Sequence, residues 1–404
     1  MDLSYGKEYE EFRVELRSFL ESSWPPKGDA AELPKAEGAK RFRQQAIERG
    51  YLYRSVPKQY GGSEQEPDAV RGQIIREEFS RAHAPMEMRG IGMMMLVPTL
   101  LERGEEWQKQ KFIPGTMSGD IVWCQGYSEP GSGSDLASLQ TRAELTGDEW
   151  LINGQKIWTT GAQRAQWMFC LCRTEPEEPK HGGISYLLIP MDQDGIEVSP
   201  LKQMNGGADF NQVFLTDART PADHIVGKRG EGWSVSRTTL KHERNSIGAA
   251  AQAVMMFEGL VRFAQQAKRD GRPVIEDPLI RERLLSLEGY VRAHEYSGMR
   301  QFTKNAKGED PGVITLMNKI NSTNIGHMVS KLALDIMGDD GMLDPVPRDE
   351  MGTIPSGSRM WLSQYMYSLG IATAGGTANI QKNVIGERGY GLPRDYYANR
   401  SSGK

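Results

Sequence analysis

The sequence is poor in cysteine and has no large excess of charge of either sign. Its 404 residues include three cysteines, Cys124, Cys170 and Cys172. Three cysteines cannot form a disulfide framework, and they lack zinc-ligand spacing with the six histidines, so no metal site is predicted. The 49 basic and 53 acidic side chains give a formal net charge of -4, which argues against a general nucleic-acid binder.

Long hydrophobic runs are also absent. We find no unbroken apolar stretch of the roughly 18 residues that a membrane-spanning helix needs. The first eight residues, MDLSYGKE, are polar and acidic and do not resemble a secretory signal. With 38% hydrophobic residues, a chain of this length is expected to form about two or three domains, each with its own core. These features predict a soluble, cytoplasmic protein with several domains and no membrane span.

The hydrophobic pattern changes twice along the chain. The first and last parts show helical periodicity, with long helices predicted over residues 68–82, 235–268, 278–305 and 311–337. The middle part has short β-rich runs between Gly, Asn, Asp and Pro turns, which predicts a small barrel or sandwich. The predicted fold class is therefore α+β, with an N-terminal helical domain, a central β domain and a C-terminal helical domain. Their predicted limits are residues 1–120, 121–232 and 233–404.

Residues 125–135, QGYSEPGSGSD, carry the densest chemical signal in the chain. Glycines let the backbone approach a ligand closely, and successive amides and serine hydroxyls supply neutral donors. Such a loop suits a flat, polar-edged cofactor or a phosphate, although a solvated turn is the simpler interpretation. It is not a P-loop, because no Gly-Lys-Ser/Thr follows, and it does not match the dinucleotide-binding fingerprint.

A second motif, NGQKIWTTG, covers residues 153–161. Asn-Gly is typical of a hairpin turn, so the residues that follow, 156–160, are predicted to form a strand. Alternation along a strand places Trp158 and Thr160 on one face, where a ring and a hydroxyl can cover a flat cofactor and bond its edge. Ordinary packing of Trp158 in a sandwich is the alternative.

The third feature is a carboxylate on a predicted helix. The apolar stripe of this helix runs from Ile247 to Val261, and one turn earlier on the same line lies Glu243. A carboxylate on the buried side is costly unless it is paired or protonated, so its pKa is expected to rise. A general base that acts near neutral pH needs such a raised pKa. A buried salt bridge to a neighbouring arginine is the alternative.

These motifs, with GTANIQKNVIGER at residues 376–388, resemble those of the acyl-CoA dehydrogenase family. The resemblance covers nearly the whole chain, and the motifs occur in the order and spacing of the family. It implies the three-domain fold, with a four-helix bundle as the C-terminal domain. It also implies an FAD-dependent oxidoreductase that converts an acyl-CoA thioester to the 2-enoyl-CoA. The implied partners are an electron-transferring flavoprotein and further copies of the chain, in a homodimer or homotetramer.

The resemblance also implies roles for individual residues. The serine-rich loop would hold the flavin and the thioester, Trp158 would flank the isoalloxazine ring, and Thr160 would hydrogen-bond near its N5 atom. An arginine would reach the FAD phosphates across a subunit interface, either Arg272 or the competing Arg269. The implied cofactor-binding residues are Gln125, Tyr127, Ser128, Gly133, Ser134, Trp158, Thr159, Thr160, Arg272, Asp335, Gly338, Thr377 and Asn379. The implied substrate-binding residues are Ser134, Lys241, Glu243 and Arg244.

The catalytic base is where the sequence departs from many family members. They carry it as the Glu of a Glu-Gly-Thr triplet, which here reads Gly375-Gly376-Thr377. Members that act on branched or long acyl chains place the base on the first long helix after the β domain, just before an arginine. That position is Glu243, so the resemblance implies that Glu243 removes the α-proton while the β-hydrogen leaves as hydride to flavin N5.

Two further departures bear on substrate and assembly. The family's Gln-x-x-Gly-Gly-Asn-Gly stretch reads DIMGDDG at residues 335–341, where acids would repel FAD phosphates. Ala374 stands where the family often has a bulky tyrosine, so a branched or ring-bearing, steroid side-chain-like acyl group is expected. Some bacterial members pair two different chains. The alternatives are therefore one subunit of a heteromeric enzyme, a non-catalytic acyl-CoA-binding partner, or an acyl-CoA or nitroalkane oxidase of the same fold.

Overall fold

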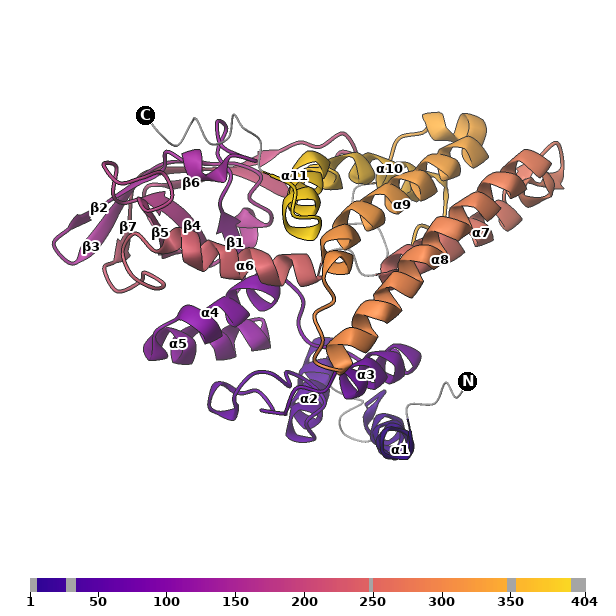
Figure 1. Ribbon diagram of the computed structural model, residues 1–404, viewed down its shortest axis with the longest axis horizontal. Coiled ribbons are helices and arrows are strands. Elements are labelled where there is room, and N and C mark those ends of the chain that lie inside the picture. Colours follow the sequence, from indigo (N-terminus) through magenta and orange to yellow (C-terminus); the bar gives the residue numbers. More distant parts are fainter. Residues whose placement is uncertain (1–5, 27–33, 247–249, 347–353, 394–404) are drawn as a thin grey trace.

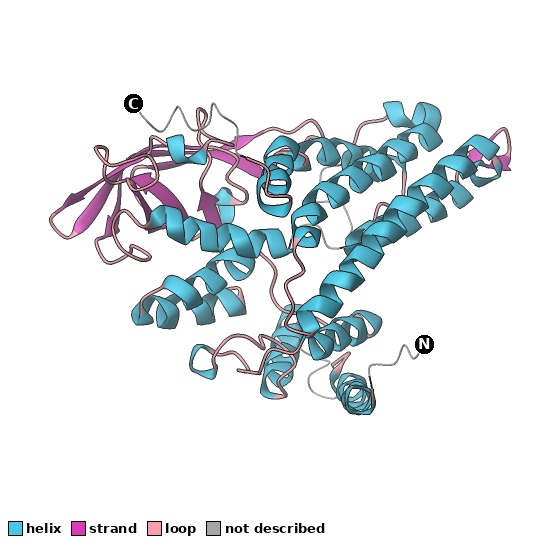
Figure 2. Cartoon of the chain, viewed as in Figure 1, coloured by secondary structure: helices cyan, strands magenta, loops and turns pink. Residues whose placement is uncertain are grey.

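Two helical regions flank a curled β-sheet in the computed structural model of the chain (Figure 1). The structure describes residues 6–26, 34–246, 250–346 and 354–393, without the side chains of residues 243–246. The predicted order of helices, then strands, then helices is confirmed, and Figure 2 shows this segregation by colour. None of the described helices is both long enough and apolar enough to cross a membrane.

The N-terminal region is built from short helices around one core. Asp68 caps the third of them by accepting a hydrogen bond from the Arg71 amide at 2.9 Å, which confirms the helix predicted over residues 68–82. Leu16, Phe42 and Phe79 are wholly or almost wholly buried where α1, α2 and α3 meet. The helices are α1 (Lys7–Ser23), α2 (Lys35–Glu48), α3 (Ala69–Arg81), α4 (Val97–Arg103) and α5 (Glu106–Ser118).

The central region is one seven-stranded sheet in the order β1-β4-β2-β3-β7-β6, with β5 paired to β4. β1 runs parallel to β4, whereas β2–β3, β3–β7, β4–β5 and β6–β7 are antiparallel pairs. The sheet curls around a core that includes Ile152, Met168 and Ile189. The strands are β1 (Trp123–Gly126), β2 (Arg142–Thr146), β3 (Glu149–Lys156), β4 (Trp167–Arg173), β5 (Ile184–Pro190), β6 (Ile196–Leu201) and β7 (Phe210–Pro221).

The hairpin predicted at Asn153-Gly154 was wrong, because this pair lies inside β3. The register with β7 shifts between Ile152 and Gly154, which marks a bulge. Gly154 has φ 155°, and a Cβ there would lie 2.5 Å from Thr141 Oγ1, so the bulge requires glycine. The actual β2–β3 turn comes earlier, between β2 and β3 at residues 147–148. The Asn-Gly signal therefore marks an irregular strand and not its end.

The predicted strand over residues 156–160 was also wrong. β3 ends at Lys156, and Trp158 has φ 61°, which no strand residue adopts. Thr159 is buried whereas Trp158 and Thr160 are exposed. The two exposed residues thus share a solvent-facing loop instead of one face of a strand.

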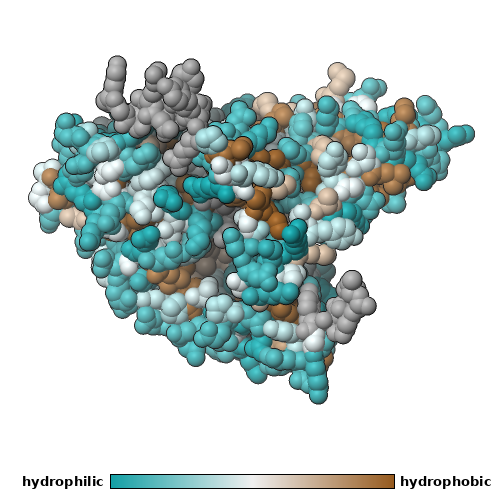
Figure 3. All heavy atoms as spheres, viewed as in Figure 1, coloured by the Kyte–Doolittle hydropathy of each residue, from teal (hydrophilic) through white to brown (hydrophobic). Residues whose placement is uncertain are grey.

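The C-terminal region is a helical bundle. α7, α8, α9 and α10 pack around a core that includes Leu260, Val329 and the fully buried Trp361. Hydrophobic residues gather near the centre of the face in Figure 3, where α6, α9 and α11 come together in Figure 1. The elements are α6 (Gly232–Ser246), α7 (Ala250–Gln266), β8 (Lys268–Arg269), β9 (Arg272–Pro273), α8 (Pro278–Ala306), α9 (Val313–Met337), α10 (Ser358–Ile371) and α11 (Ala378–Val384).

The helix predicted over residues 235–268 corresponds to α6 and α7, and residues 247–249 between them lie outside the described part of the chain. α6 packs against β5 and α4, and α7 belongs to the bundle. The buried side of α7 carries Ala253, Phe257 and Leu260, whereas Val261 is only partly buried. Ile247 lies outside the described residues. Of the predicted stripe, Ala251 is exposed and Val254 is only partly buried, so the stripe was wrong over α7, whereas the side of α6 on which Glu243 lies is not tested.

Candidate functional site

A cavity of about 1090 Å³ lies where the sheet, α6 and the C-terminal segment meet. Its walls come from the end of α4, the loop after β1, α6, and residues 375–388. Six residues that the sequence analysis assigned to the cofactor or the substrate line it together: Gln125, Tyr127, Ser128, Gly133, Ser134 and Lys241. The structure thus brings the serine-rich loop and the substrate-side helix to one space.

The cavity also has basic and aromatic residues that the sequence analysis missed. Arg237 and Lys241 are four residues apart on α6, so they lie on one side of the helix, and Arg388 lines the same cavity. His181 and Trp233 also line the cavity, and their ring centroids lie 4.6 Å apart. The four-residue spacing of the two basic residues was the available signal for a surface that binds anionic groups.

The serine-rich loop folds back on itself at the cavity wall. Glu129 and Ser132 exchange two backbone hydrogen bonds, of 2.9 Å and 3.0 Å. The Ser132 hydroxyl donates to the carbonyls of Asp135 and Leu136. A Cβ added at Gly133 would meet nothing within 4 Å, so this part of the loop leaves open space beside its amides. The loop is a fixed turn that can admit a ligand close to its backbone.

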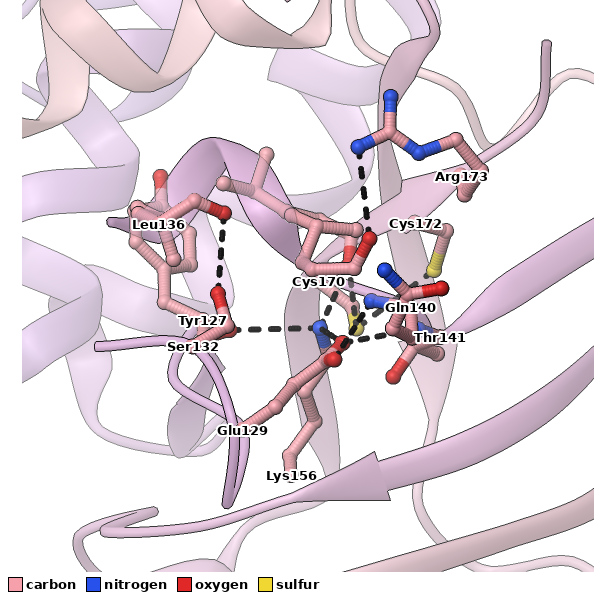
Figure 4. Close-up of polar contacts among 12 residues, drawn as sticks. Tyr127, Glu129, Ser132, Leu136, Gln140, Thr141, Lys156, Cys170, Cys172 and Arg173 are labelled. Carbon is pink, nitrogen blue, oxygen red and sulfur yellow. Dashed lines mark hydrogen bonds and ion pairs between the residues drawn. The ribbon is translucent and has the colours of Figure 1, made fainter. Parts of the chain in front are cut away.

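Beneath the loop lies a buried ion pair (Figure 4). Lys156 Nζ lies 2.8 Å from Glu129 Oε1, and both side chains are almost wholly buried. Burial raises the pKa of Glu129, but the Lys156 ammonium and hydrogen bonds lower it further, so that pKa lies below its ordinary value. Glu129 is therefore ionised at neutral pH, and the pair is a charged one.

Trp158 and its neighbours form a second rigid segment. Thr159 and Asn211 exchange backbone hydrogen bonds of 3.0 Å and 3.1 Å, and Asn211 Nδ2 donates to Thr159 O at 2.9 Å. These contacts hold Trp158 at φ 61°, a conformation that costs of order 1–3 kcal/mol for a bulky residue. Phe210 packs edge-on against the Trp158 ring, which stays 60% exposed.

The donor set of this segment fits a flavin. The buried Thr159 hydroxyl has no hydrogen-bond partner within the described part of the chain. A buried hydroxyl without a partner is costly, so a ligand edge that bonds it would be stabilised. The exposed Trp158 ring offers an apolar face beside it. A flat ring with a polar edge satisfies both, which is the chemistry expected of the isoalloxazine of FAD.

The arginines that the resemblance assigns to the FAD phosphates do not line the cavity. The β8–β9 hairpin, which carries Arg269 and Arg272, lies at the tip of α7 and α8, far from the sheet (Figure 2). Arg269 donates to Asp277 at 3.4 Å and to the Asp335 carbonyl at 3.0 Å, whereas Arg272 is exposed. Gly338 caps the end of α9 beside them. One chain does not bring this group to the cavity, so its contact with FAD across a subunit interface stays a prediction.

The C-terminal wall of the cavity is a glycine turn. Thr377 caps α11, its hydroxyl accepting from the Ile380 amide at 3.3 Å, and Asn379 is exposed on the same helix. Gly375 and Gly376 precede them and line the cavity. No side chain larger than hydrogen projects from this part of the wall.

Glu243 and Arg244 lie in the last turn of α6, and their side chains are outside those that the structure describes. Two residues earlier, Lys241 lines the cavity. His242 Nε2 lies 2.7 Å from Glu102 Oε1, which ties this turn of α6 to α4. The raised pKa and the catalytic role of Glu243 remain predictions. Within the described residues, no group of three or more His, Cys, Asp or Glu side chains is placed to hold a metal ion.

Comparison with known protein families gives three consecutive matches. Residues 6–120 match the model of the acyl-CoA dehydrogenase N-terminal domain, residues 124–218 the middle domain and residues 230–390 the C-terminal domain. The chain is 36% identical over 398 residues to acyl-CoA dehydrogenase IpdE1 of Mycobacterium tuberculosis, with 96% of this chain and 99% of that protein covered.

Two solved structures are similar over nearly their whole length. The ChsE4-ChsE5 complex from Mycobacterium tuberculosis has 27% identity and a TM-score of 0.74, covering 98% of this chain and 100% of that one. The Tcur3481-Tcur3483 steroid ACAD has 29% identity and a TM-score of 0.75, with the same coverage.

Proposed function

Because the chain belongs to the acyl-CoA dehydrogenase family, we propose that it oxidises the α,β-bond of a branched or ring-bearing acyl-CoA to give the 2-enoyl-CoA. The family makes the chain an FAD-dependent oxidoreductase that acts on acyl-CoA. When bound, FAD supplies the hydride acceptor. We also retain residues 1–120, 121–232 and 233–404 as the proposed domain limits, and a place in acyl-chain β-oxidation in the cytoplasm.

The lining of the cavity carries the substrate part of this proposal. The cavity of about 1090 Å³ is lined by residues assigned to the cofactor as well as to the substrate, so its lining and not its volume bears on the acyl group. The wall at Gly375 and Gly376 has no side chain that would restrict the acyl group. One of the two similar structures, Tcur3481-Tcur3483, is named as a steroid enzyme, which supports a ring-bearing acyl group here as well.

The proposed chemistry assigns distinct tasks to residues of this chain. Arg237 and Lys241 bind anionic groups of the thioester substrate. Donors of the serine-rich loop, with Ser134 at the cavity, orient the thioester. Glu243 removes the α-proton, which a hydrogen-bonded thioester carbonyl makes more acidic. Arg244, next to it, is proposed to contact the substrate.

A screen of CoA thioesters tests the function directly. Purified holoprotein is mixed anaerobically with straight-chain, branched and steroid side-chain acyl-CoA thioesters, and bleaching of the flavin absorption is followed. We expect bleaching with branched or ring-bearing thioesters at rates well above those with straight chains. Bleaching by straight chains alone would contradict the substrate part, and bleaching by none of them would contradict the dehydrogenase itself.

A second candidate is one subunit of a heteromeric acyl-CoA dehydrogenase. The observation that favours it is the pair of similar structures, each of which is named for two different proteins. A chain of this kind, purified alone, would bind little FAD and would not turn over until a partner chain is added. A homodimer or homotetramer that bleaches unaided, and then reduces an electron-transferring flavoprotein without releasing peroxide, would favour the first proposal over both this one and a flavin oxidase.

A further inference from the structure

The Lys156 side chain lies entirely inside the protein, although the residue stands where β3 passes into a loop. It is 0% exposed and is the last residue of β3. Its ammonium donates to Glu129 Oε1 and to the Leu171 carbonyl, each at 2.8 Å, and to the Tyr127 carbonyl at 3.3 Å (Figure 4). These three acceptors use its three protons. The lysine therefore connects β3 to β4 and to both sides of the first turn of the serine-rich loop.

The Glu129 carboxylate makes matching connections from the loop to β2. Its Oε2 accepts a hydrogen bond from the Gln140 amide at 2.6 Å, and its Oε1 accepts one from the Thr141 amide at 2.9 Å. Residues 140 and 141 lie directly before β2. The Glu129 carboxylate thus ties the serine-rich loop to the residues that lead into β2.

The same pair fixes the Trp158 segment relative to the loop. Lys156 lies two residues before Trp158, and between them the Ile157 amide donates to the Ser128 carbonyl at 2.9 Å. The loop lines the cavity, and the Trp158 segment carries the unpartnered Thr159 hydroxyl. The two segments expected to contact the flavin are therefore joined through Lys156 and Ser128.

A buried ion pair is a poor way to stabilise a sheet. Removing both charges from water costs about as much as their attraction returns, so an apolar replacement of similar shape is often neutral or stabilising. What the charged pair provides here is geometry, because each of its polar atoms is bonded to a defined backbone group. A ligand site held in its bound shape loses less conformational freedom on binding.

We propose that Lys156 and Glu129 are positioning residues for the flavin, which hold the serine-rich loop and the Trp158–Thr160 segment at the spacing that FAD requires before it binds. The proposal rests on the proposed function only in taking FAD as the ligand. Neither side chain touches the reacting atoms, so both act through the backbone groups that they hold.

The test compares the Lys156→Met and Glu129→Gln variants with the double variant that carries both changes. Apo-protein is titrated with FAD to obtain the dissociation constant, and its thermal midpoint is measured separately. Each single variant leaves one buried charge without its partner, so we expect a lower midpoint and an FAD affinity weaker by about tenfold or more. The double variant has no unpaired charge, so its midpoint should rise above those of both single variants, although the backbone groups that the pair bonded stay without these partners.

The double variant separates positioning from stability. We expect its FAD affinity to stay about tenfold or more below that of the wild type, and the visible circular dichroism of its bound flavin to differ, since the loop is no longer held by charged bonds. Recovery of FAD affinity together with the midpoint would show a structural role only and would overturn the proposal. Unchanged affinity in the single variants, or a double variant that cannot fold, would do the same.

A matched control is Glu78→Gln in the N-terminal region. Glu78 is also a buried carboxylate, 1% exposed, and is bonded by arginines on α1 and α3, away from the serine-rich loop. Its variant should lower the midpoint and leave FAD affinity unchanged. Because the readout is binding and not turnover, a wild type that binds FAD yet oxidises no acyl-CoA would remove the proposed function without affecting this test.

Discussion

Lys319 Nζ donates to the Gly376 carbonyl at 2.9 Å, so a buried lysine of α9 holds the glycine turn that forms one wall of the cavity. The same ammonium donates to the Ile371 and Ala372 carbonyls at the end of α10, at 3.1 Å and 3.2 Å. It therefore stabilises the C-terminal end of a helix and positions the turn that follows.

Lys319→Met should loosen this wall. Three partly buried backbone carbonyls would lose a charged donor, and we expect a loss of about 1–3 kcal/mol in the free energy of unfolding. KM for the preferred acyl-CoA should rise more than kcat falls, because the residue shapes the cavity and lies outside the proposed proton transfer. Denaturant unfolding and steady-state kinetics measure the two effects, and a kcat loss at unchanged KM would contradict this.

Glu243→Gln should bind FAD and acyl-CoA but fail to bleach the flavin. The amide has the shape of the carboxylate yet cannot accept the α-proton, and general-base catalysis is worth about 10²–10⁴-fold. Stopped-flow absorbance of the reduced flavin measures the rate. Glu102→Gln, on α4 beside the same turn of α6, is the matched control and should keep most of the rate. Bleaching by Glu243→Gln at the normal rate would exclude Glu243 as the base.

Leu316 should influence the choice of acyl group. It lines the cavity from α9, near the glycine turn. Leu316→Phe adds volume to the cavity wall, so kcat/KM should fall for ring-bearing thioesters and change little for short straight chains. One extra or missing methylene in a hydrophobic pocket changes selectivity by about 10–200-fold, and we expect an effect of this order. Equal losses for both substrate classes would indicate general damage instead of a narrower cavity.

Asn211→Ala should weaken the support of the strained Trp158 residue. The change removes the hydrogen bonds from Nδ2 to the Thr159 carbonyl and to Gln163 Oε1, of 2.9 Å and 2.7 Å. We expect about 1–3 kcal/mol lower stability and weaker FAD binding, since Trp158 can then leave its φ of 61°. Tryptophan fluorescence and FAD titration are the measurements. Gln163→Ala is the control, because it removes only the hydrogen bond between Asn211 Nδ2 and Gln163 Oε1.

Acid should destabilise the N-terminal region through Glu78. Hydrogen bonds from Arg17, and then from Arg13 and Arg81, outweigh burial and lower the pKa of Glu78 from 4.5 to about 2. A carboxyl with a lowered folded-state pKa contributes stability that is complete above 4.5 and is lost as the pH falls from 4.5 through about 2. Denaturant midpoints from pH 7 to pH 2.5 should fall less in Glu78→Gln than in the wild type, and parallel curves would contradict the assignment.

Local signals predicted the regular elements well. The helix predicted over residues 68–82 has Asp68 at its cap, and the β-rich runs predicted for the middle part form strands such as β5, because capping and strand propensity act over a few residues. The hairpin and strand predicted for residues 153–160 were wrong, because an Asn-Gly pair fits a glycine bulge as well as a turn. Only the pairing of β3 with β7 decides between the two.

The site was predictable only in part. The loop residues from Gln125 to Ser134 were found from glycine and serine content, but the burial of Lys156 was not, since a lysine in an alternating stretch usually points to solvent. Its position depends on Glu129 and on the Leu171 carbonyl, which become neighbours only when the sheet forms. The joint position of Arg237 and Arg388 was missed for the same reason, because they line one cavity only after tertiary folding.

The cavity joins a loop near residue 130 to a wall near residue 380, and this has a consequence for how the holoprotein is made. During synthesis the loop leaves the ribosome long before the glycine turn and α11 exist. The cavity is therefore incomplete for most of translation and is closed on this side only after α11 has been made and has packed against α9.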